Sequence, residues 1–266
     1  MVNFQIAEAC GIDDLLKIME ILRAPGGCPW DQAQTHQSIR ANLLEEAYET
    51  ADAIDHMDMA NLKEELGDVL LQVVFHARIA QESSAFTFDD VVDGVCRKLV
   101  YRHPHVFGTV DARDGSEALN VWDAQKRAEK GQKTAGDALD SVARALPALT
   151  RASKLQSKAA TAGFDWEEVS PALDKLSEEL EELKTAVREG SNVEEELGDL
   201  LFAAVNVARF VKVDPEAALT GATDKFIARF RLVEELARKE GKSMEDMDLE
   251  ALDALWEQAK AALKQA

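Results

Sequence analysis

The sequence predicts an all-α protein built from two copies of one helical domain. Three observations lead to this prediction: the composition, the spacing of apolar residues and an internal repeat. Only 14 of the 266 residues are glycine and 6 are proline, while 30% are charged, a composition that favours long helices. Apolar residues recur at helical spacing, and the alternation typical of strands is absent. We therefore expect helical bundles whose short loops connect antiparallel neighbours.

The internal repeat joins two segments that read almost alike. The first contains LLEEAYETADAI and LKEELGDVLLQVVFHARIA, and the second contains LSEELEELKTAV and VEEELGDLLFAAVNVARF. Three further pairs follow in the same order at nearly constant spacing: Gly27-x-x-Trp30 with Gly163-x-x-Trp166, Lys98-x-x-x-Arg102 with Lys225-x-x-x-Arg229, and Trp122-x-x-x-Lys126 with Trp256-x-x-x-Lys260. This order indicates a tandem duplication. We predict domains at residues 1–132 and 140–266, divided within the polar stretch 129–138.

Start and stop signals define four helices in each domain. Ser170-Pro171 is predicted to be an N-cap followed by proline at the first helical position, and Gly190 a C-terminal cap. Asp214-Pro215 is predicted to start another helix in the same manner. In the second domain we expect helices over 170–188, 193–211, 214–241 and 248–263; in the first we expect them at about 38–55, 60–82, 88–102 and 116–129.

Charge and cysteine content exclude several classes of protein. The formal net charge of −20 repels nucleic acid, and we find no basic run longer than a pair of residues. No stretch of 18 or more apolar residues exists, so we expect no membrane span, and the first 20 residues lack the pattern of a signal peptide. Three cysteines without a C-x-x-C pair argue against a disulfide framework or a zinc site. We expect a cytoplasmic protein.

The sharpest chemical signal is E-x-x-E followed by E-x-x-D. Residues three apart share one face of a helix, so two antiparallel helices can gather four carboxylates. Such a cluster is unfavourable without a cation, and oxygen ligands suit Mg²⁺. Either pair alone would be interpreted as a solvent-exposed helix face. Here, however, the neighbouring residues are apolar, which indicates packed helices, and the same arrangement occurs twice. The candidate metal ligands are Glu179, Glu182, Glu196 and Asp199, with a second, less certain set at Glu46, Glu49, Glu65 and Asp68.

Glycine stands beside the aspartate in the middle of each predicted helix. A glycine in a helix interior costs about 1 kcal/mol relative to alanine. Gly67 and Gly198 therefore suggest the close approach of a neighbouring helix or a ligand, and ordinary helix packing is an equal alternative.

Basic and aromatic residues that could bind a phosphorylated ligand follow the carboxylates. Lys225 and Arg229 share a helix face and could engage phosphate oxygens, with surface salt bridges as the alternative. Trp256 and Lys260 lie one turn apart; the indole could stack on a base, although a core position is the better interpretation. Lys175 lies one turn before Glu179 and could also reach a phosphate.

Several other catalytic classes lack their signatures. No Glu-x-x-His accompanies the carboxylates, which argues against a di-iron oxidase bundle. None of the five histidines has the spacing of a zinc hydrolase. A Walker A loop, G-x-G-x-x-G and G-x-S-x-G are also absent.

The motifs taken together resemble one family. GGCPWDQAQTH, RHPHVFG, GFDWEEV and DKFIARF, with the acidic segments above, occur in order over nearly the whole chain and resemble the MazG family of the all-α NTP pyrophosphohydrolase superfamily. The resemblance implies Mg²⁺-dependent hydrolysis of (deoxy)nucleoside triphosphates, ATP included, to monophosphate and pyrophosphate. It also implies a homodimer whose second domain is catalytic. We expect broad base specificity, and Mn²⁺ as a possible substitute for Mg²⁺.

The resemblance also assigns residues by position. It implies the metal ligands already given and nucleotide contacts at Lys175, Glu178, Glu179, Asn192, Glu195, Asp199, Lys225, Arg229, Trp256 and Lys260. Asn192 stands where the family often has lysine, which puts one phosphate contact in doubt. In the first domain, Lys98, Arg102, Trp122 and Lys126 keep the matching residue types.

The candidate residues suggest a mechanism for this hydrolysis, and two alternative functions stay open. Water would attack the α-phosphorus while Lys225 and Arg229 stabilise charge on the phosphates, and either Glu178 or Glu195 would orient or deprotonate that water. One rival is a narrower dUTPase or dCTPase of the same superfamily. Another is a helical interaction protein without catalysis, for which the acidic pairs are solvated faces.

Overall fold

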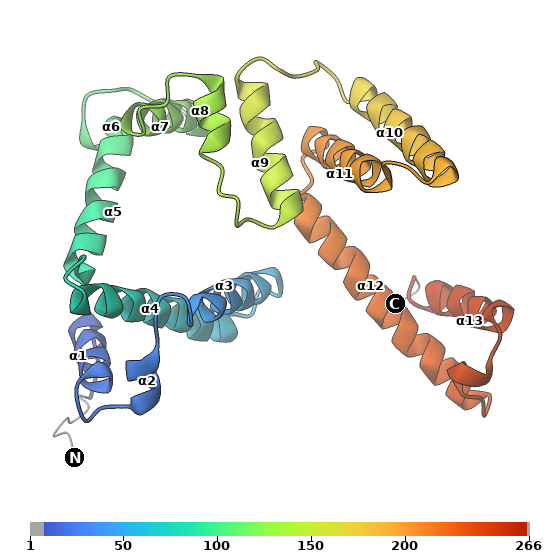
Figure 1. Ribbon diagram of the computed structural model, residues 1–266, viewed down its shortest axis with the longest axis horizontal. Helices are drawn as coiled ribbons and strands as arrows, with labels where there is room; N and C mark the ends of the chain where they lie inside the picture. Colours follow the sequence, from blue (N-terminus) through green and yellow to red (C-terminus); the bar gives the residue numbers. More distant parts are fainter. Residues whose placement is uncertain (1–7, 265–266) are drawn as a thin grey trace. The chain divides into compact units, whose positions relative to one another are not determined.

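The computed structural model describes residues 8–264 and is helical throughout, with no strand in that range. Residues 1–7 and 265–266, which belong to the two predicted domains, lie outside the described residues. Residues 1–7 are also part of the N-terminal segment for which we expected no signal peptide. Two compact units divide between Lys126 and Arg127, so α7 (Gly115–Glu129) runs across the boundary. Figure 1 shows the helices in chain order.

In the described part of unit 1, from residue 8 onward, six helices precede α7. They are α1 (Ile12–Arg23), α2 (Pro29–Ala33), α3 (Arg40–Asp55), α4 (Met59–Glu82), α5 (Phe88–Arg102) and α6 (Pro104–Phe107). Helix α3 packs along α4, and α1 packs across α4. Met19, Ile39, Val74 and Phe75 form the buried cluster between them. This core fixes the α3–α4 pair that carries the first acidic set.

Unit 2 repeats the paired arrangement with different surroundings. Its elements are α8 (Ala135–Asp140), α9 (Ala148–Thr161), α10 (Ser170–Glu189), α11 (Val193–Phe210), α12 (Pro215–Lys239), the 3₁₀ turn Met244–Asp246 and α13 (Leu249–Ala262). Helix α10 packs along α11, and α9 packs against α11. A separate buried cluster, containing Val233, Ala237, Leu255 and Ala259, joins α12 to α13. In Figure 1 the long α12 leads away from α11 toward α13.

The predicted helices are confirmed to within two residues at nearly every end. Gly190 adopts the left-handed conformation, with φ of 67°, that a helix C-terminal cap requires. Asp214 caps α12, because its side chain accepts bonds from the backbone N–H groups of Glu216 and Ala217. The N-cap of α10 differs from the prediction: Ser170 is the first helical residue and Val169 takes the N-cap position, which was predicted for Ser170. Helices α1, α2, α6, α8 and α9 were not among the predicted ranges.

The glycines beside the two aspartates have open space where a Cβ would stand. A Cβ added at Gly67 or Gly198 would meet no described atom within 4 Å. The expectation that a neighbouring helix approaches closely at these positions is therefore wrong for the single chain. None of the described helices is long and apolar enough to cross a membrane.

Candidate active site

The second acidic set converges where α10 lies against α11. Oxygen atoms of Glu179, Glu196 and Asp199 all lie within 4.8 Å of one another. Glu179 is buried, with 6% of its surface exposed, whereas Asp199 is exposed. The turn at Gly190–Asn192, in which both of these residues have positive φ, reverses the chain tightly enough to align the two helices. An all-oxygen donor set of this kind fits a hard divalent cation such as Mg²⁺.

Glu182 joins this set through Glu179 rather than as one of the three converging ligands. A hydrogen bond with Glu179, together with burial and the repulsion between the two carboxylates, raises the pKa of Glu182. Lys175 lies on the same face and places Nζ 2.8 Å from both Glu178 and Glu179. These bonds raise the pKa of Lys175 above its ordinary range. The ammonium group of Lys175 thus offsets part of the negative charge of the cluster.

The first acidic set converges in the same way between α3 and α4. Oxygen atoms of Glu46, Glu49 and Glu65 lie within 4.8 Å of one another. Burial, followed by neighbouring carboxylates that include Asp68, raises the pKa of Glu46 and Glu65. Asp68 therefore belongs to the electrostatic environment of the cluster, although it is not one of the three converging ligands. Unit 1 can hold a cation by the same chemistry as unit 2.

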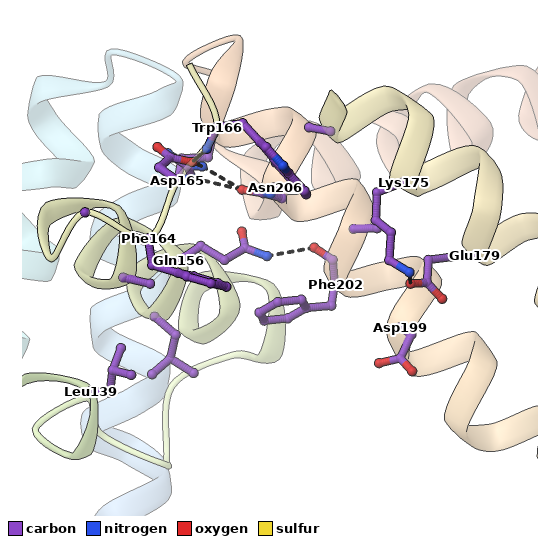
Figure 2. Close-up of a pocket in the computed structure, with 16 residues that line it drawn as sticks. Leu139, Gln156, Phe164, Asp165, Trp166, Lys175, Glu179, Asp199, Phe202 and Asn206 are labelled. Carbon is purple, nitrogen blue, oxygen red and sulfur yellow. Dashed lines mark hydrogen bonds and ion pairs between the residues drawn. The ribbon is translucent and has the colours of Figure 1, made fainter. Parts of the chain in front are cut away.

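A cavity of about 610 Å³ opens beside the second carboxylate cluster. Lys175, Glu179 and Asp199 line one end, whereas apolar and aromatic side chains line most of the rest. Figure 2 shows the carboxylates on the far side of Phe202 from Gln156 and Phe164. Such a pocket, apolar with a few convergent polar groups, is the usual form of a small-molecule site.

An ion pair holds the aromatic loop at the rim of this cavity. Arg209 donates to both carboxylate oxygens of Asp165, at 2.8 and 2.5 Å, and two of its nitrogens also donate to the Asn206 side-chain oxygen. The guanidinium lowers the pKa of Asp165. Because Asp165 lies between Phe164 and Trp166, this pair fixes the loop that presents both rings.

The predicted phosphate and base contacts on α12 and α13 do not gather at the cavity within one chain, whereas Lys175 on α10 lines it. Among the described residues, the cavity lining contains none from α12 or α13. Lys225 is exposed on α12, and the guanidinium carbon of Arg229 lies 5.8 Å from the Trp256 ring centroid. Trp256 packs against Phe226 at the α12–α13 contact, and Lys260 pairs with Glu257. The family resemblance had implied that these groups contact the nucleotide.

The remaining predicted contacts lie on α10 and at the start of α11. Glu178 pairs with Lys175, as described above. Asn192 is the exposed N-cap residue of α11, with φ of 54°, and its side chain makes no capping bond. Glu195 is exposed in the first turn of α11, next to Glu196.

The matching residues of the first copy form a cation–π cluster. The Arg102 guanidinium lies 5.2 Å and the Lys126 ammonium 4.4 Å from the Trp122 ring centroid. Arg102 is buried, with 7% of its surface exposed. The contact between Arg102 and Trp122 in unit 1 thus corresponds to the contact between Arg229 and Trp256 in unit 2.

Sequence reasoning missed several residues that line the cavity. Gln156, Phe202 and Asn206 were given no functional role, and Trp166 was noted only as part of the repeat and of the motif GFDWEEV. Gln156 is a buried polar residue on α9, with 7% of its surface exposed. A polar residue on the apolar face of an amphipathic helix was the available signal, but helix 148–161 itself was not predicted.

The fold and the site together define a class of protein. The chain is an all-α tandem repeat in which each unit carries an acidic cluster suited to a divalent cation, and in unit 2 this cluster adjoins a small-molecule cavity.

Comparison with known proteins identifies the family. A model described as MazG nucleotide pyrophosphohydrolase domain matches residues 34–107 and again residues 167–234. The chain is 47% identical over 248 residues to the nucleoside triphosphate pyrophosphohydrolase/pyrophosphatase MazG of Thermotoga maritima, covering 93% of this chain and 95% of that protein. It is 46% identical over 254 residues to the nucleoside triphosphate pyrophosphohydrolase of Escherichia coli K12, covering 94% and 97%. The protein belongs to the MazG family and is an enzyme of the hydrolase class.

One solved structure is also similar in part. It is the crystal structure of a mazG-related protein from Thermotoga maritima, with 30% identity and a TM-score of 0.38. The match covers 43% of this chain and 98% of that chain.

Proposed function

We propose that the protein hydrolyses (deoxy)nucleoside triphosphates to the nucleoside monophosphate and pyrophosphate, with broad base specificity. The observation that carries this proposal is the convergence of Glu179, Glu196 and Asp199 at one end of a 610 Å³ cavity. A nucleotide has two ends of the same kinds: a polyanionic triphosphate and a planar aromatic base with apolar faces. The names of the relatives support the same reaction.

Glu179, Glu182, Glu196 and Asp199 would hold Mg²⁺, or Mn²⁺ in its place. The bound cation would neutralise triphosphate charge and acidify water at the α-phosphorus. Lys175 stands one turn from the cluster and has an ammonium group to offer a phosphate. Glu178 and Glu195 flank the ligands in sequence and would orient the attacking water or accept its proton.

Lys225 and Arg229 are proposed to stabilise charge that develops on the phosphates. They lie outside the cavity in the single chain, so we propose that a homodimer places them at the site of the second copy. Exposed apolar side chains support such an assembly; in unit 2 they include Leu180, Leu197, Leu201, Phe226 and Phe230. Faces of this kind usually mark an interface between proteins. Trp256 and Lys260 would approach the nucleotide with the same pair of helices.

The reaction is tested by pyrophosphate release from the common NTPs and dNTPs, with Mg²⁺ and with EDTA. We expect Glu196→Ala to lower kcat by at least about 100-fold, because a metal ligand is lost. Glu194→Ala is the matched control, since this glutamate starts the same helix but lies outside the cluster. Turnover by Glu196→Ala at the rate of the control would refute the assignment.

The same assay separates the two units and the rival functions. Glu65→Ala should leave most of the activity if unit 2 is catalytic. Release confined to dUTP or dCTP would favour a narrower enzyme. No release from any nucleotide would favour a helical interaction protein.

A further inference from the structure

Two histidines face one another in unit 1, at a place to which the proposed chemistry assigns no role. His36 lies in the loop between α2 and α3, and His76 lies on α4 directly after the core residue Phe75. Their Nδ1 atoms are 2.8 Å apart. The ring planes differ by 3° and the ring centroids are 5.1 Å apart, which is the length of that contact plus one ring radius on either side. The two rings are therefore coplanar and meet edge to edge, as an N–H···N hydrogen bond requires.

This bond needs one proton between the two Nδ1 atoms, so one ring donates and the other accepts. Burial decides which ring is the donor. His76 Nε2 is buried and has no hydrogen-bond partner among the described residues, whereas His36 is exposed. An accepting ring carries its own proton on Nε2, and on His76 that N–H group would be buried and unpaired, which is unfavourable. The donating N–H group thus belongs to His76, and the N–H group at Nε2 of His36 is left for water.

A further proton disrupts this arrangement wherever it binds. On His36 Nδ1 it would face the N–H group of His76, and a shift of the His76 proton to Nε2 would leave that N–H group unpaired. On His76 Nε2 it would create a buried charge without a partner. Burial accordingly lowers the pKa of His76, and the charge of a protonated His36 lowers that pKa further. The neutral pair is therefore the state in which both rings are satisfied.

Charged groups on the neighbouring elements do not alter this balance. Helices α1, α3 and α5 pack against α4, and α2 precedes the loop that carries His36. Arg23 and Arg78 both pair with Glu82. Within residues 8–264, His36 is the charged group that shifts the pKa of His76. The other charged side chains on these elements include Lys17, Glu20 and Arg23 on α1, Asp31 on α2, Arg40 on α3, Arg78 and Glu82 on α4, and Asp89 and Asp90 on α5.

The histidine bond joins the loop between α2 and α3 to α4 beside the core of unit 1. Ile39, at the end of this loop, is 1% exposed and belongs to the buried cluster that contains Val74 and Phe75. Helix α3 begins at the next residue, Arg40, and carries Glu46 of the first acidic set. Loss of the bond therefore frees the loop from α4 and exposes one edge of this core.

We propose that His36 and His76 form a proton-controlled latch. While both rings are neutral, the latch holds the loop at residues 34–39 on α4, and protonation of the pair releases the loop and loosens unit 1. Unit 2 has no counterpart, because the spacing of the repeat places Val169 and Val207 at the corresponding positions. Acidification thus acts on one copy of the repeat and leaves the other unchanged. The latch does not depend on the proposed reaction.

Hydrogen exchange of the full chain tests the latch at two pH values. Because the pKa of His76 is lowered in the folded state, the stabilisation is fully present above the unfolded value of about 6.5 and is lost as the pH falls through the folded value. We expect protection of residues 34–39, corrected for intrinsic exchange, to fall about tenfold between pH 7.5 and pH 5. Residues 167–172 of unit 2 should keep their protection. Equal protection of residues 34–39 at both pH values would overturn the proposal, as would an equal loss in both segments.

The variant His36→Ala removes the latch at every pH. Residues 34–39 of this variant should exchange as fast at pH 7.5 as those of the wild type at pH 5, with little further change on acidification. His56→Gln is the matched control, because His56 is an exposed histidine at the C-terminal end of α3, and it should keep the tenfold response. A pH response retained in His36→Ala would overturn the proposal.

Nitrogen-15 NMR of the wild-type protein tests the bond without any substitution. At pH 7.5 the two Nδ1 atoms should show a scalar coupling through the N–H···N bond, with the proton on His76 Nδ1. The coupling should disappear at pH 5, together with the protection of the loop. Absence of the coupling at pH 7.5 would show that the two rings are not bonded and would overturn the proposal.

Discussion

At the residue scale, single side chains differ in how far their charge is neutralised. Glu179 is buried and has the Lys175 ammonium group at 2.8 Å, whereas Asp199 is exposed and forms no ion pair with any of residues 8–264. Glu82 in unit 1 is a carboxylate with two cationic partners. Arg23 donates to it at 3.0, 3.2 and 2.8 Å, and Arg78 donates at 3.0 Å. These bonds tie α1 to the end of α4.

The Arg23–Glu82 pair predicts a pH-dependent contribution to stability. The Arg23 side chain is only 5% exposed, so Glu82→Gln should lower the free energy of unfolding by about 1–2 kcal/mol at neutral pH. The hydrogen bond with Arg23 lowers the pKa of Glu82 in the folded state. The stabilisation is therefore fully present above the unfolded pKa of about 4.3 and is lost as the pH falls through the folded value.

Urea unfolding between pH 3 and 7 measures this contribution. Glu20→Gln serves as the control, because Glu20 pairs with Lys17 on the exposed surface of α1 and its removal should have no measurable effect. A Glu82→Gln deficit that is equal at pH 3 and pH 7 would contradict the electrostatic origin.

At the element scale, end signals determine where the helices of unit 2 begin and end. Asp214 accepts bonds of 2.9 and 3.0 Å from the first free N–H groups of α12, and Pro215 follows at the first helical position. Gly190 ends α10 in a conformation that residues with a Cβ adopt at a cost. These local signals act within one turn, which is why sequence alone located them.

The cap of α12 gives a second stability prediction. Asp214→Ala leaves two backbone N–H groups without their partner and should lower the free energy of unfolding by about 1 kcal/mol. Asp214→Asn keeps an accepting oxygen and should recover most of that loss. Chemical denaturation of the three proteins tests this, and equal stability of the alanine and wild-type proteins would show that the cap does not contribute.

At the scale of the whole molecule, the proposed homodimer accounts for two features, the exposed apolar faces and the position of Lys225 and Arg229 outside the cavity. Phe230 on α12 is 47% exposed, while Lys225 and Arg229 on the same helix lie outside the cavity. A homodimer would cover such faces and bring a second α12 to each carboxylate cluster.

The dimer is tested by light scattering with size-exclusion chromatography. Phe230→Glu places a charge on the proposed interface and should shift the protein toward monomer, whereas Ala228→Glu, at an exposed position of the same helix, should remain dimeric. A monomeric wild type would exclude this assembly.

Complementation tests whether the two copies share a site. Mixing Glu196→Ala with Arg229→Ala, each inactive alone, should restore part of the turnover in the mixed dimer. Failure to recover activity would show that Arg229 acts with the carboxylates of its own chain and not with those of the second copy.

The sequence by itself determined the all-α fold, the repeat, most helix ends and the two acidic clusters. Each of these depends on residues that lie within one helix or across one tight turn. Glu179 and Glu196 were predictable partners because a short connection forces α10 against α11. Membership of the family followed from motifs that are themselves local.

Only the tertiary structure decided what surrounds the carboxylates. The cavity joins α9, the Gly163–Trp166 loop and α11, and the Asp165–Arg209 pair that shapes its rim spans 44 positions of sequence. Packing also showed that Trp256 contacts Phe226 and not this cavity. Contacts between distant segments depend on the angles at which helices cross, and side-chain packing sets these angles after the helices have formed.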